Sequence, residues 1–355
     1  MALTDASTAV RDGEALDTRL LDPYLKAHIP GLQGTPVVSQ FPGGASNLTY
    51  LLQYADQELV LRRPPFGHKA RSAHDMGREY RILTQLYSGF PYCPKAYLHC
   101  TDTTLIGAEF YLMERVRGII LRADLPVELQ LSPDRTEALC KGFIDRLVEL
   151  HQVDYRACGL AKLGKPDGYV RRQISGWAER YEKAMTPDAP AWAEVKAWLA
   201  DRQPADHPRS AIVHNDYRFD NVILAADDPL RIVGVLDWEL TTIGDPLMDL
   251  GNSLAYWIQA DDPAPVQLMR RQPSNAPGML TRAQFVAYYA ERSGIAIDNI
   301  DFYYTYGLFR LAAIVQQIYY RYYHGQTQDK RFAPFIHMNR LLERMSLQVI
   351  EQSRL

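Results

Sequence analysis

The residues with the clearest chemical potential lie in the segment AIVHNDYRFDNVIL (211–224). Two short apolar runs, AIV and VIL, enclose a polar stretch that contains His214, Asp216, Arg218 and Asn221. Apolar runs of this length are typical of buried strands or strand ends. The polar stretch is therefore expected to be a short loop held between two buried anchors, which is a suitable base for side chains that act on a substrate.

A second acid follows this loop at a spacing that suits metal binding. Asp237 lies sixteen residues after Asn221, at the end of the apolar run RIVGVLD. An acid at the end of a buried strand is expected to face a cleft, where it and Asn221 offer the oxygen ligands that Mg²⁺ prefers. Asp216 is then left to face a substrate hydroxyl. A plain surface turn is the alternative interpretation, because Asn and Asp are common in turns.

This order of residues is the layout of phosphoryl transfer, H-x-D-x-x-x-x-N followed by a metal-binding Asp. Arg218 lies two residues after the acid, where a guanidinium can make a bidentate contact with the transferring phosphate. Under this interpretation Asp216, Arg218 and Asn221 are catalytic candidates, and Asn221 and Asp237 bind the metal. We expect His214 to hold the loop in shape and to take no part in acid–base chemistry.

Candidates for nucleotide binding lie upstream, in the chain order that this layout requires. The segment FPGGASNLTYLL places a glycine turn between two strand-like runs, and such a turn can bring backbone N–H groups close to phosphates. The turn lacks the pattern G-x-G-x-x-G, and a plain hairpin is the alternative. The candidates in this turn are Gly43, Gly44, Ser46 and Asn47.

A cation and an acid follow the turn. In kinases the third strand carries a cation that holds the α- and β-phosphates, and Arg62 of ELVLRR takes this place, where most kinases have Lys. Glu79 lies seventeen residues later in a helical segment and could pair with Arg62. The alternatives are a solvated Arg-Arg pair and a solvated Glu.

The run LMERV is a further candidate for nucleotide binding. It ends a strand-like segment at the point where strand-like patterns give way to helical ones. Its backbone around Glu114 and Val116 is expected to hydrogen-bond an adenine edge. Met113 is expected to line the adenine pocket, and simple core packing is the alternative for this residue.

Hydrophobic periodicity divides the chain into two parts. Strand-like patterns dominate from about 36 to 115, with one helical pattern at 73–88. Beyond Gly118, helical patterns cover about 132–152, 167–184, 190–201, 246–259, 280–293, 299–323 and 333–352. The strand-like exception in this part is 211–237, and 261–278 is Pro-rich and loop-like.

These patterns predict an α+β fold with two lobes. Residues 1–115 are expected to form a small, mainly β nucleotide-binding lobe with one inserted helix and an amphipathic N-terminal helix at 14–29. Residues 116–355 are expected to form a large, mainly α lobe that carries out catalysis and binds the acceptor.

Composition narrows the function classes. The chain has 355 residues, of which 47% are hydrophobic and 23% charged, and this is typical of a globular protein with more than one core. The net charge of −3 argues against broad nucleic-acid binding, and no apolar run approaches the ~18–20 residues of a membrane span. The start lacks a signal-peptide pattern, and four cysteines without metal-ligand spacing favour a reducing compartment. We expect a cytoplasmic protein with a small-molecule partner, and the oligomeric state stays open.

With these motifs, the chain resembles the aminoglycoside phosphotransferase and choline kinase-like family over roughly 35–325. Members typically read HGD, then N, then D-W-E, then G-D-P-x-x-D-L, and here Asn215 replaces the usual Gly. The resemblance implies a bilobal protein-kinase-like fold, ATP with Mg²⁺, and transfer of the γ-phosphate to an alcohol group. It also implies that Asp249 braces the catalytic loop. The short interval from Asp237 to Gly244 leaves no room for a long activation segment, which weighs against a protein kinase.

A narrower resemblance concerns the acceptor. The stretches FPGGASNLTYLL, LVLRRPP, AHDMGREYRIL and FRLAAIVQQIYYRYYHGQ are similar to the branch related to the kinase domain fused to acyl-CoA dehydrogenases and to bacterial 4-hydroxyacyl-CoA kinases. The implied acceptors are hydroxyacyl-CoA thioesters. The alternatives are an aminoglycoside- or choline-type phosphotransferase and a non-catalytic nucleotide-binding module that regulates a partner.

The long C-terminal helical pattern also bears on the acceptor. It carries Arg310, Gln317 and Arg321 at helical spacing, so the three could share one face that suits an anionic or acyl-bearing molecule. A polycationic aminoglycoside would instead need several carboxylates. The alternative is an aromatic core helix with its arginines on the solvent side.

Overall fold

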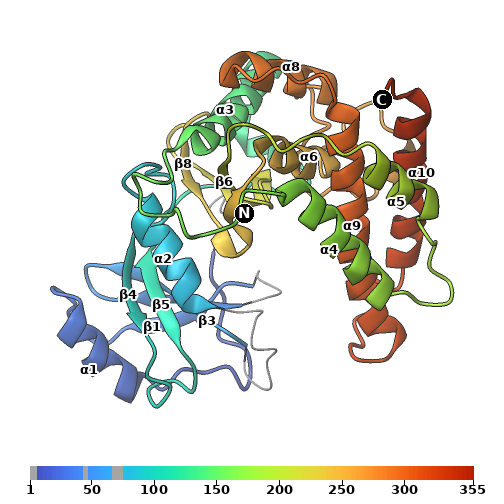
Figure 1. Cartoon of the computed structure of the whole chain (residues 1–355). Helices are drawn as coiled ribbons and strands as arrows, with labels where there is room; N and C mark the ends of the chain where they lie inside the picture. Colours follow the sequence, from blue (N-terminus) through green and yellow to red (C-terminus); the bar gives the residue numbers. More distant parts are fainter. Residues whose placement is uncertain (1–5, 43–46, 66–74) are drawn as a thin grey trace. The chain divides into compact units, whose positions relative to one another are not determined.

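The computed structural model describes residues 6–42, 47–65 and 75–355, which form two compact units (Figure 1). Unit 1 comprises Met1–Ile120, Tyr155–Leu160 and Asn221–Glu239, and unit 2 comprises Leu121–Asp154, Ala161–Asp220 and Leu240–Leu355. Residues 221–239 therefore belong to unit 1, although most of the chain after residue 120 belongs to unit 2.

Unit 1 is built on an antiparallel sheet with the strand order β1-β2-β3-β5-β4. Its strands are β1 (Val37–Gln40), β2 (Leu48–Gln53), β3 (Glu58–Arg63), β4 (Ala96–Cys100) and β5 (Phe110–Glu114). One helix, α2 (Met76–Leu86), lies between β3 and β4 in the sequence and packs on β4 and β5. Asp75 caps this helix by accepting a hydrogen bond from the Arg78 N–H. The prediction of a mainly β part with one inserted helix is confirmed.

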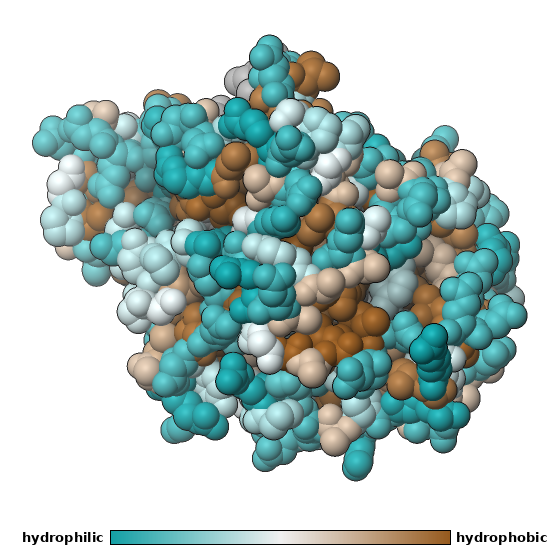
Figure 2. Space-filling model, turned by 90° about the horizontal axis from the view of Figure 1, so that it is seen from above, coloured by the Kyte–Doolittle hydropathy of each residue, from teal (hydrophilic) through white to brown (hydrophobic). Residues whose placement is uncertain are grey.

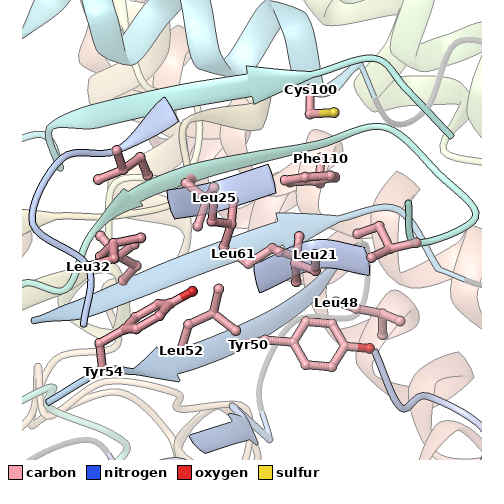
Figure 3. Packing of buried hydrophobic residues seen from close by; sticks show 14 residues of the cluster. Leu21, Leu25, Leu32, Leu48, Tyr50, Leu52, Tyr54, Leu61, Cys100 and Phe110 are labelled. Atoms are coloured by element: carbon pink, nitrogen blue, oxygen red, sulfur yellow. The ribbon is translucent and has the colours of Figure 1, made fainter. Parts of the chain in front are cut away.

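Helix α1 (Thr18–His28) covers part of this sheet, as the amphipathic pattern at 14–29 predicts. Leu21 and Leu25 are fully buried and pack with Tyr50, Leu61 and Phe110 (Figure 3). Burial of a Leu or Phe side chain contributes roughly 1.5–3 kcal/mol, so this contact gives the sheet a rigid support.

Unit 1 also contains the hairpin of β7 (Val222–Leu224) and β8 (Ile232–Val235). Ile119 pairs with Leu224, and the Val235 N–H donates to the Tyr92 carbonyl at 2.7 Å. Gly118 makes this contact possible, because a Cβ at this position would lie 2.2 Å from the Leu224 carbonyl oxygen. The hairpin is thus tied to unit 1 at both strands.

Unit 2 is mainly helical, as predicted. Its helices are α3 (Pro133–Gln152), α4 (Tyr169–Lys183), α5 (Ala193–Asp201), α6 (Pro246–Ala255), α7 (Ala264–Gln267), α8 (Arg282–Ser293), α9 (Ile300–Tyr323) and α10 (Phe335–Gln352). A small sheet pairs β6 (Ala211–Val213) with β9 (Thr242–Gly244). The short 3₁₀ turns in the described part of the chain are η1 (Val127–Leu129), η2 (Phe219–Asn221), η3 (Trp238–Leu240) and η4 (Lys330–Phe332). The helix predicted at 246–259 ends earlier than expected, at Ala255.

Helices α6 and α9 approach each other closely in unit 2. A Cβ at Gly251 would lie 2.1 Å from the Tyr303 carbonyl oxygen, and a Cβ at Gly307 would lie 2.1 Å from the Gly251 carbonyl oxygen. The two glycines therefore permit backbone contact that no larger residue allows. This contact fixes the elements that carry Asp249 and Arg310.

In the described part of the chain, no helix combines the length and the apolar character that a bilayer crossing requires. Hydrophilic residues cover much of the face in Figure 2, with apolar patches between them.

Candidate active site

The β7–β8 hairpin brings the two predicted metal ligands to one end of a sheet in unit 1. Val222 pairs with Val235, and beyond this pair the Leu236 N–H donates to the Asn221 carbonyl at 2.8 Å. Asp237 comes next in the chain, with a φ of 68° that Asp adopts more readily than most residues. The Asn221 side chain is buried, and the Asp237 side chain is 34% exposed.

Arg62 of β3 forms ion pairs with three carboxylates of unit 1. Its Nη1 lies 3.0 Å from Glu79 Oε1 on α2, so the ion pair expected between these residues is present. Its Nη2 lies 2.9 Å from Asp237 Oδ1 and 3.3 Å from Glu239 Oε2. The fork of a guanidinium explains how one side chain reaches three acids, which a Lys ammonium on the same strand would do less rigidly.

Glu239 is a site residue that the sequence interpretation did not assign. Its Oε2 accepts a hydrogen bond from Asn47 Nδ2 at 3.1 Å, and its carbonyl accepts one from Arg78 Nη1 at 3.0 Å. The signal was available, because Glu239 is the third residue of the D-W-E motif and lies two residues after Asp237. Asn47, a candidate from the glycine turn, is thereby placed at this cluster.

The structure places only some of the other residues that were predicted to bind the nucleotide. Gly43, Gly44 and Ser46 lie outside the described residues. Met113 is buried in β5, in line with its packing alternative. The Glu114 N–H donates to the Lys95 carbonyl at 2.9 Å, so this donor is engaged in the sheet, whereas the Glu114 carbonyl stays a candidate for the nucleotide. Val116 packs against Gly234, where a Cβ would lie 3.0 Å from its Cγ1.

A divalent cation would have two protein oxygen ligands beside the cluster around Arg62, because no group of three acidic, histidine or cysteine side chains in the described part of the chain is arranged to hold a metal. Glu79, Asp237 and Glu239 converge on one guanidinium, which leaves an excess of negative charge on the carboxylates. Burial raises the pKa of Glu79, and the Arg62 charge opposes this rise. The amide of Asn221 and the carboxylate of Asp237 supply hard oxygen ligands, few enough for Mg²⁺ to keep waters and phosphate oxygens in its shell. The residues present therefore fit the metal.

In unit 2, Asp249 of α6 braces the loop that precedes Asp216. Its Oδ2 accepts a hydrogen bond from the His214 N–H, and its Oδ1 accepts one from the Asn215 N–H, both at 2.7 Å. Its Oδ2 also lies 3.1 Å from Nε2 of His151 on α3. Asp249 is completely buried, so these contacts are needed to stabilise its charge.

Asn215 occupies the position where the resembling family has Gly. Its φ of 64° lies in the left-handed region, which explains the usual Gly and the acceptable Asn. Its Nδ2 donates to the Leu240 carbonyl at 3.0 Å, and its Oδ1 accepts a hydrogen bond from Asn252 Nδ2 at 3.1 Å. The Asn thus adds side-chain bonds that a Gly cannot make.

Arg218 orients the predicted catalytic acid. Its Nε lies 3.1 Å from Asp216 Oδ1, its Nη2 donates to Asp216 Oδ2 at 3.2 Å, and the same Nη2 lies 3.4 Å from Asp220 Oδ2. The guanidinium carbon lies 4.5 Å from the centre of the Tyr256 ring. The residue expected to contact a phosphate is therefore ion-paired with Asp216 in this structure.

The loop that carries these side chains is itself anchored. The Tyr217 hydroxyl donates to the Phe143 carbonyl at 2.8 Å, and the Phe219 N–H donates to Gln272 Oε1 at 2.9 Å. Both rings are fully buried, and Phe219 stacks on Phe143 with ring centres 4.2 Å apart. Alternate residues of the loop thus point into the core, which leaves Asp216 and Arg218 on its polar side.

The three acceptor candidates of α9 do not form one group. Arg310 is buried, Gln317 is half-buried and Arg321 is exposed in the last turn. Eleven residues separate Arg310 from Arg321, and this corresponds to roughly 16 Å of helix rise. The spacing predicts one face correctly, but the two arginines lie in different surroundings.

The pH dependence of stability should reveal the bonds of Asp249. Burial alone would raise its pKa, but the hydrogen bond and charge of His151, together with the charge and N–H of His214, outweigh burial and lower the pKa. A carboxyl with a lowered folded pKa stabilises the fold above its unfolded pKa of about 3.9, and this contribution is lost as the pH falls further. The free energy of unfolding, measured by urea titration, should therefore differ between the wild type and Asp249→Asn at pH 7.

This difference should shrink as the pH falls below about 4, because protonation then removes the charge from Asp249 in the wild type as well. A difference that stays constant down to pH 3 would contradict a stabilising carboxylate at this position.

Comparison with known proteins identifies the family. The model of the phosphotransferase enzyme family (APH) matches residues 37–285. The chain belongs to this family. It is therefore a phosphotransferase with an alcohol group as acceptor, as predicted, and a small-molecule kinase.

Relatives with curated names are longer than this chain. Human acyl-CoA dehydrogenase family member 11 is 33% identical over 345 residues, which cover 95% of this chain and 43% of the relative. Mouse acyl-CoA dehydrogenase family member 10 is 37% identical over 328 residues, which cover 90% of this chain and 30% of the relative. The chain thus spans less than half the length of these relatives.

Solved structures support the predicted fold. A candidate aminoglycoside phosphotransferase from Ralstonia eutropha is 31% identical, with a TM-score of 0.82 over 96% of this chain and 100% of that chain. A choline kinase from Cryptosporidium parvum, at 12% identity, has a TM-score of 0.63 over 95% and 96% of the two chains, and this shows the fold alone. The prediction of an α+β protein-kinase-like fold is confirmed.

Proposed function

We propose that the chain transfers the γ-phosphate of Mg·ATP to a hydroxyl group of an acyl compound, with hydroxyacyl-CoA as the acceptor class. The observation that carries the proposal is that the charged candidate residues form two separate groups, one in each unit. Asp216 is paired with Arg218 on one loop of unit 2, whereas in unit 1 Arg62 is paired with Asp237, and Asn221 and Asp237 lie at the same end of the β7–β8 hairpin.

Nucleotide binding is assigned to the residues of unit 1. Mg·ATP would supply the phosphoryl group that is transferred, and Asn221 and Asp237 would hold the metal. Arg62 would contact the α- and β-phosphates, since it is already fixed by Glu79. Asn47 would add an amide donor near Glu239. The glycines and Ser46 of the preceding turn, with Met113 to Val116, complete the proposed nucleotide site.

Asp216 would act on the acceptor. It orients the hydroxyl, whose oxygen forms a bond to the γ-phosphorus while the bond to the bridging oxygen breaks and ADP leaves with the electron pair. An Asp is a weak base near pH 7, so its carboxylate takes the hydroxyl proton late in a loose transition state. The contacts of Arg218 with the described residues use Nε and Nη2, and its Nη1 is directed to a phosphate oxygen in this proposal.

The acyl acceptor is supported by two observations. The curated relatives carry names of acyl-CoA dehydrogenases, although this chain matches less than half of each. Helix α9 places a buried Arg310 in unit 2, and an arginine does not suit a polycationic aminoglycoside or choline. An aminoglycoside- or choline-type activity and a non-catalytic nucleotide-binding module remain the competing functions.

A side-by-side screen tests the proposal. ADP release would be measured with Mg·ATP and a 4-hydroxyacyl-CoA, choline, an aminoglycoside or no acceptor, and Mg·GTP would replace Mg·ATP in a parallel series. We expect acceptor-dependent turnover with the hydroxyacyl-CoA and with ATP. Turnover with choline or the aminoglycoside alone would contradict the acceptor class. ATP binding without turnover on any acceptor would favour the regulatory module.

A further inference from the structure

Arg310 of α9 is a buried charge whose role the catalytic residues do not explain. It is only 3% exposed, and its guanidinium carbon lies 5.1 Å from the centre of the Trp177 ring on α4. Across residues 6–42, 47–65 and 75–355, no carboxylate or hydrogen-bond acceptor pairs with this guanidinium.

A buried arginine without an anionic partner lowers the stability of the folded protein. Guanidinium groups that leave bulk water are normally paired with a carboxylate or phosphate, because an unpaired buried charge loses hydration without compensation. The contact with the Trp177 ring recovers only part of this loss. The other two buried arginines of the described residues have oxygen partners, since Arg62 is paired with the Glu79 carboxylate and Arg63 donates to the Ile106 carbonyl at 2.7 Å. Arg310 differs from both, because within the described residues its guanidinium has the Trp177 ring and no oxygen acceptor as a partner.

The surroundings of Arg310 are aromatic and carry a second cation. Arg180, also on α4, lies 4.6 Å from the centre of the same Trp177 ring. Burial raises the pKa of Tyr306, and the charges of Arg310 and Arg180 oppose this rise, so both guanidiniums act on one tyrosine hydroxyl. A guanidinium suits a planar or tetrahedral oxyanion, because its N–H groups match the geometry of carboxylate and phosphate oxygens.

Tyr256 connects this group to the predicted catalytic loop within unit 2. Its ring lies against Arg218, which holds Asp216. Burial raises the pKa of Tyr256, the charge of Asp216 adds to the rise, and the charges of Arg218 and Arg310 oppose it. Tyr256 ends α6, whose backbone contacts α9, so the ring that lies against Arg218 and the helix that carries Arg310 are neighbours within unit 2. An acceptor whose hydroxyl meets Asp216 could place a second polar group at Arg310.

We propose that Arg310, stacked on Trp177, binds an oxyanion of the phosphate acceptor and so selects negatively charged hydroxy compounds. The inference rests on the proposed function, because it assigns the acceptor to the same loop. The oxyanion is either the carboxylate of a free hydroxy acid or a phosphate of a CoA moiety. Both make the charged, hydrogen-bonded contacts that the unpaired guanidinium lacks.

Direct binding tests this inference without relying on turnover. Calorimetric titrations of the full chain would use 4-hydroxyhexanoate, its primary amide, its CoA thioester and its pantetheine thioester. The variants are Arg310→Met, Arg310→Lys and the matched control Arg331→Met, which removes an arginine that is 86% exposed and lies outside the proposed sites. We expect Arg310→Met to weaken binding of at least one charged ligand by ~10–100-fold, as for loss of a charge-assisted hydrogen bond.

The neutral ligands separate the two sources of the anion. Selective weakening of 4-hydroxyhexanoate, with its amide unchanged, identifies the carboxylate. Selective weakening of the CoA thioester, with the pantetheine thioester unchanged, identifies a phosphate. Arg310→Lys should restore part of the affinity, and Arg331→Met should leave it at the wild-type value. Equal affinities of wild type and Arg310→Met for every charged ligand would overturn the inference.

Thermal unfolding separates binding from a structural role. Replacement of an unpaired buried cation by an apolar side chain of similar length is expected to leave the melting temperature unchanged or raised, whereas loss of a structural contact would lower it. A lowered melting temperature together with unchanged ligand affinity would assign Arg310 to the fold. Binding that depends on Arg310 without any phosphoryl transfer would keep the inference and refute the proposed function.

Discussion

Asp216→Asn is expected to lower kcat by ~10²–10⁴-fold, the usual contribution of a positioned general base. The amide keeps the size of the carboxylate and one acceptor oxygen for Arg218, so the loop should keep its shape. It cannot accept the hydroxyl proton, and it no longer offsets the Arg218 charge beside the acceptor. Steady-state kinetics with the acceptor identified by the screen would give kcat, and fluorescence titration would give the affinity for Mg·ATP, which should not change.

Asp227→Asn is the matched control for this variant. Asp227 also neighbours an arginine, Arg231, at 2.7 Å, but its side chain is 77% exposed in a turn. An exposed pair contributes little, so this substitution should leave both kcat and stability near the wild-type values. Full turnover of Asp216→Asn under the same conditions would remove Asp216 from the catalytic machinery.

Asp237→Asn is expected to abolish the Mg²⁺-dependent part of nucleotide affinity and to lower kcat by ~10²–10³-fold, as for loss of one group that stabilises transition-state charge. Asn is preferred over Ala here, because the φ of 68° is better tolerated by Asn. Arg62 keeps its contacts with Glu79 and Glu239, so the strand and helix should stay in place.

The measurement for Asp237→Asn is a nucleotide titration with and without Mg²⁺, compared with wild type and Asp227→Asn. The wild type and the control should bind ATP more tightly when Mg²⁺ is present. If Asp237→Asn shows the same gain from Mg²⁺ as the wild type, Asp237 is not a metal ligand.

Much of the candidate site follows from local sequence patterns. Apolar runs on both sides of Asp216 predict the short strands β6 and β7, and the run that ends at Asp237 predicts β8. Arg62, Glu79 and Asp216 follow one another along the chain in the same order as the corresponding functional residues of kinases. This order therefore predicts a phosphotransferase. The long helices were predictable for the same reason, since their periodicity is a property of neighbouring residues.

Other features depend on contacts between distant parts of the chain. The bond from His151 to Asp249 joins residues 98 apart, and the bond from Arg62 to Asp237 joins residues 175 apart. The D-W-E motif marks Glu239 as a candidate, but only the fold shows that its carboxylate meets Arg62.

The sequence alone determined the family, the element types and the chemical identity of the catalytic candidates, because motif spacing and periodicity are local properties. The tertiary structure decided which residues of the same type are buried and which are exposed. Arg310 and Arg321 share a face of α9, yet only Arg310 lies in the interior without an anionic partner. Burial sets the free energy of a charge, and burial is known only when the helices that enclose it are in place.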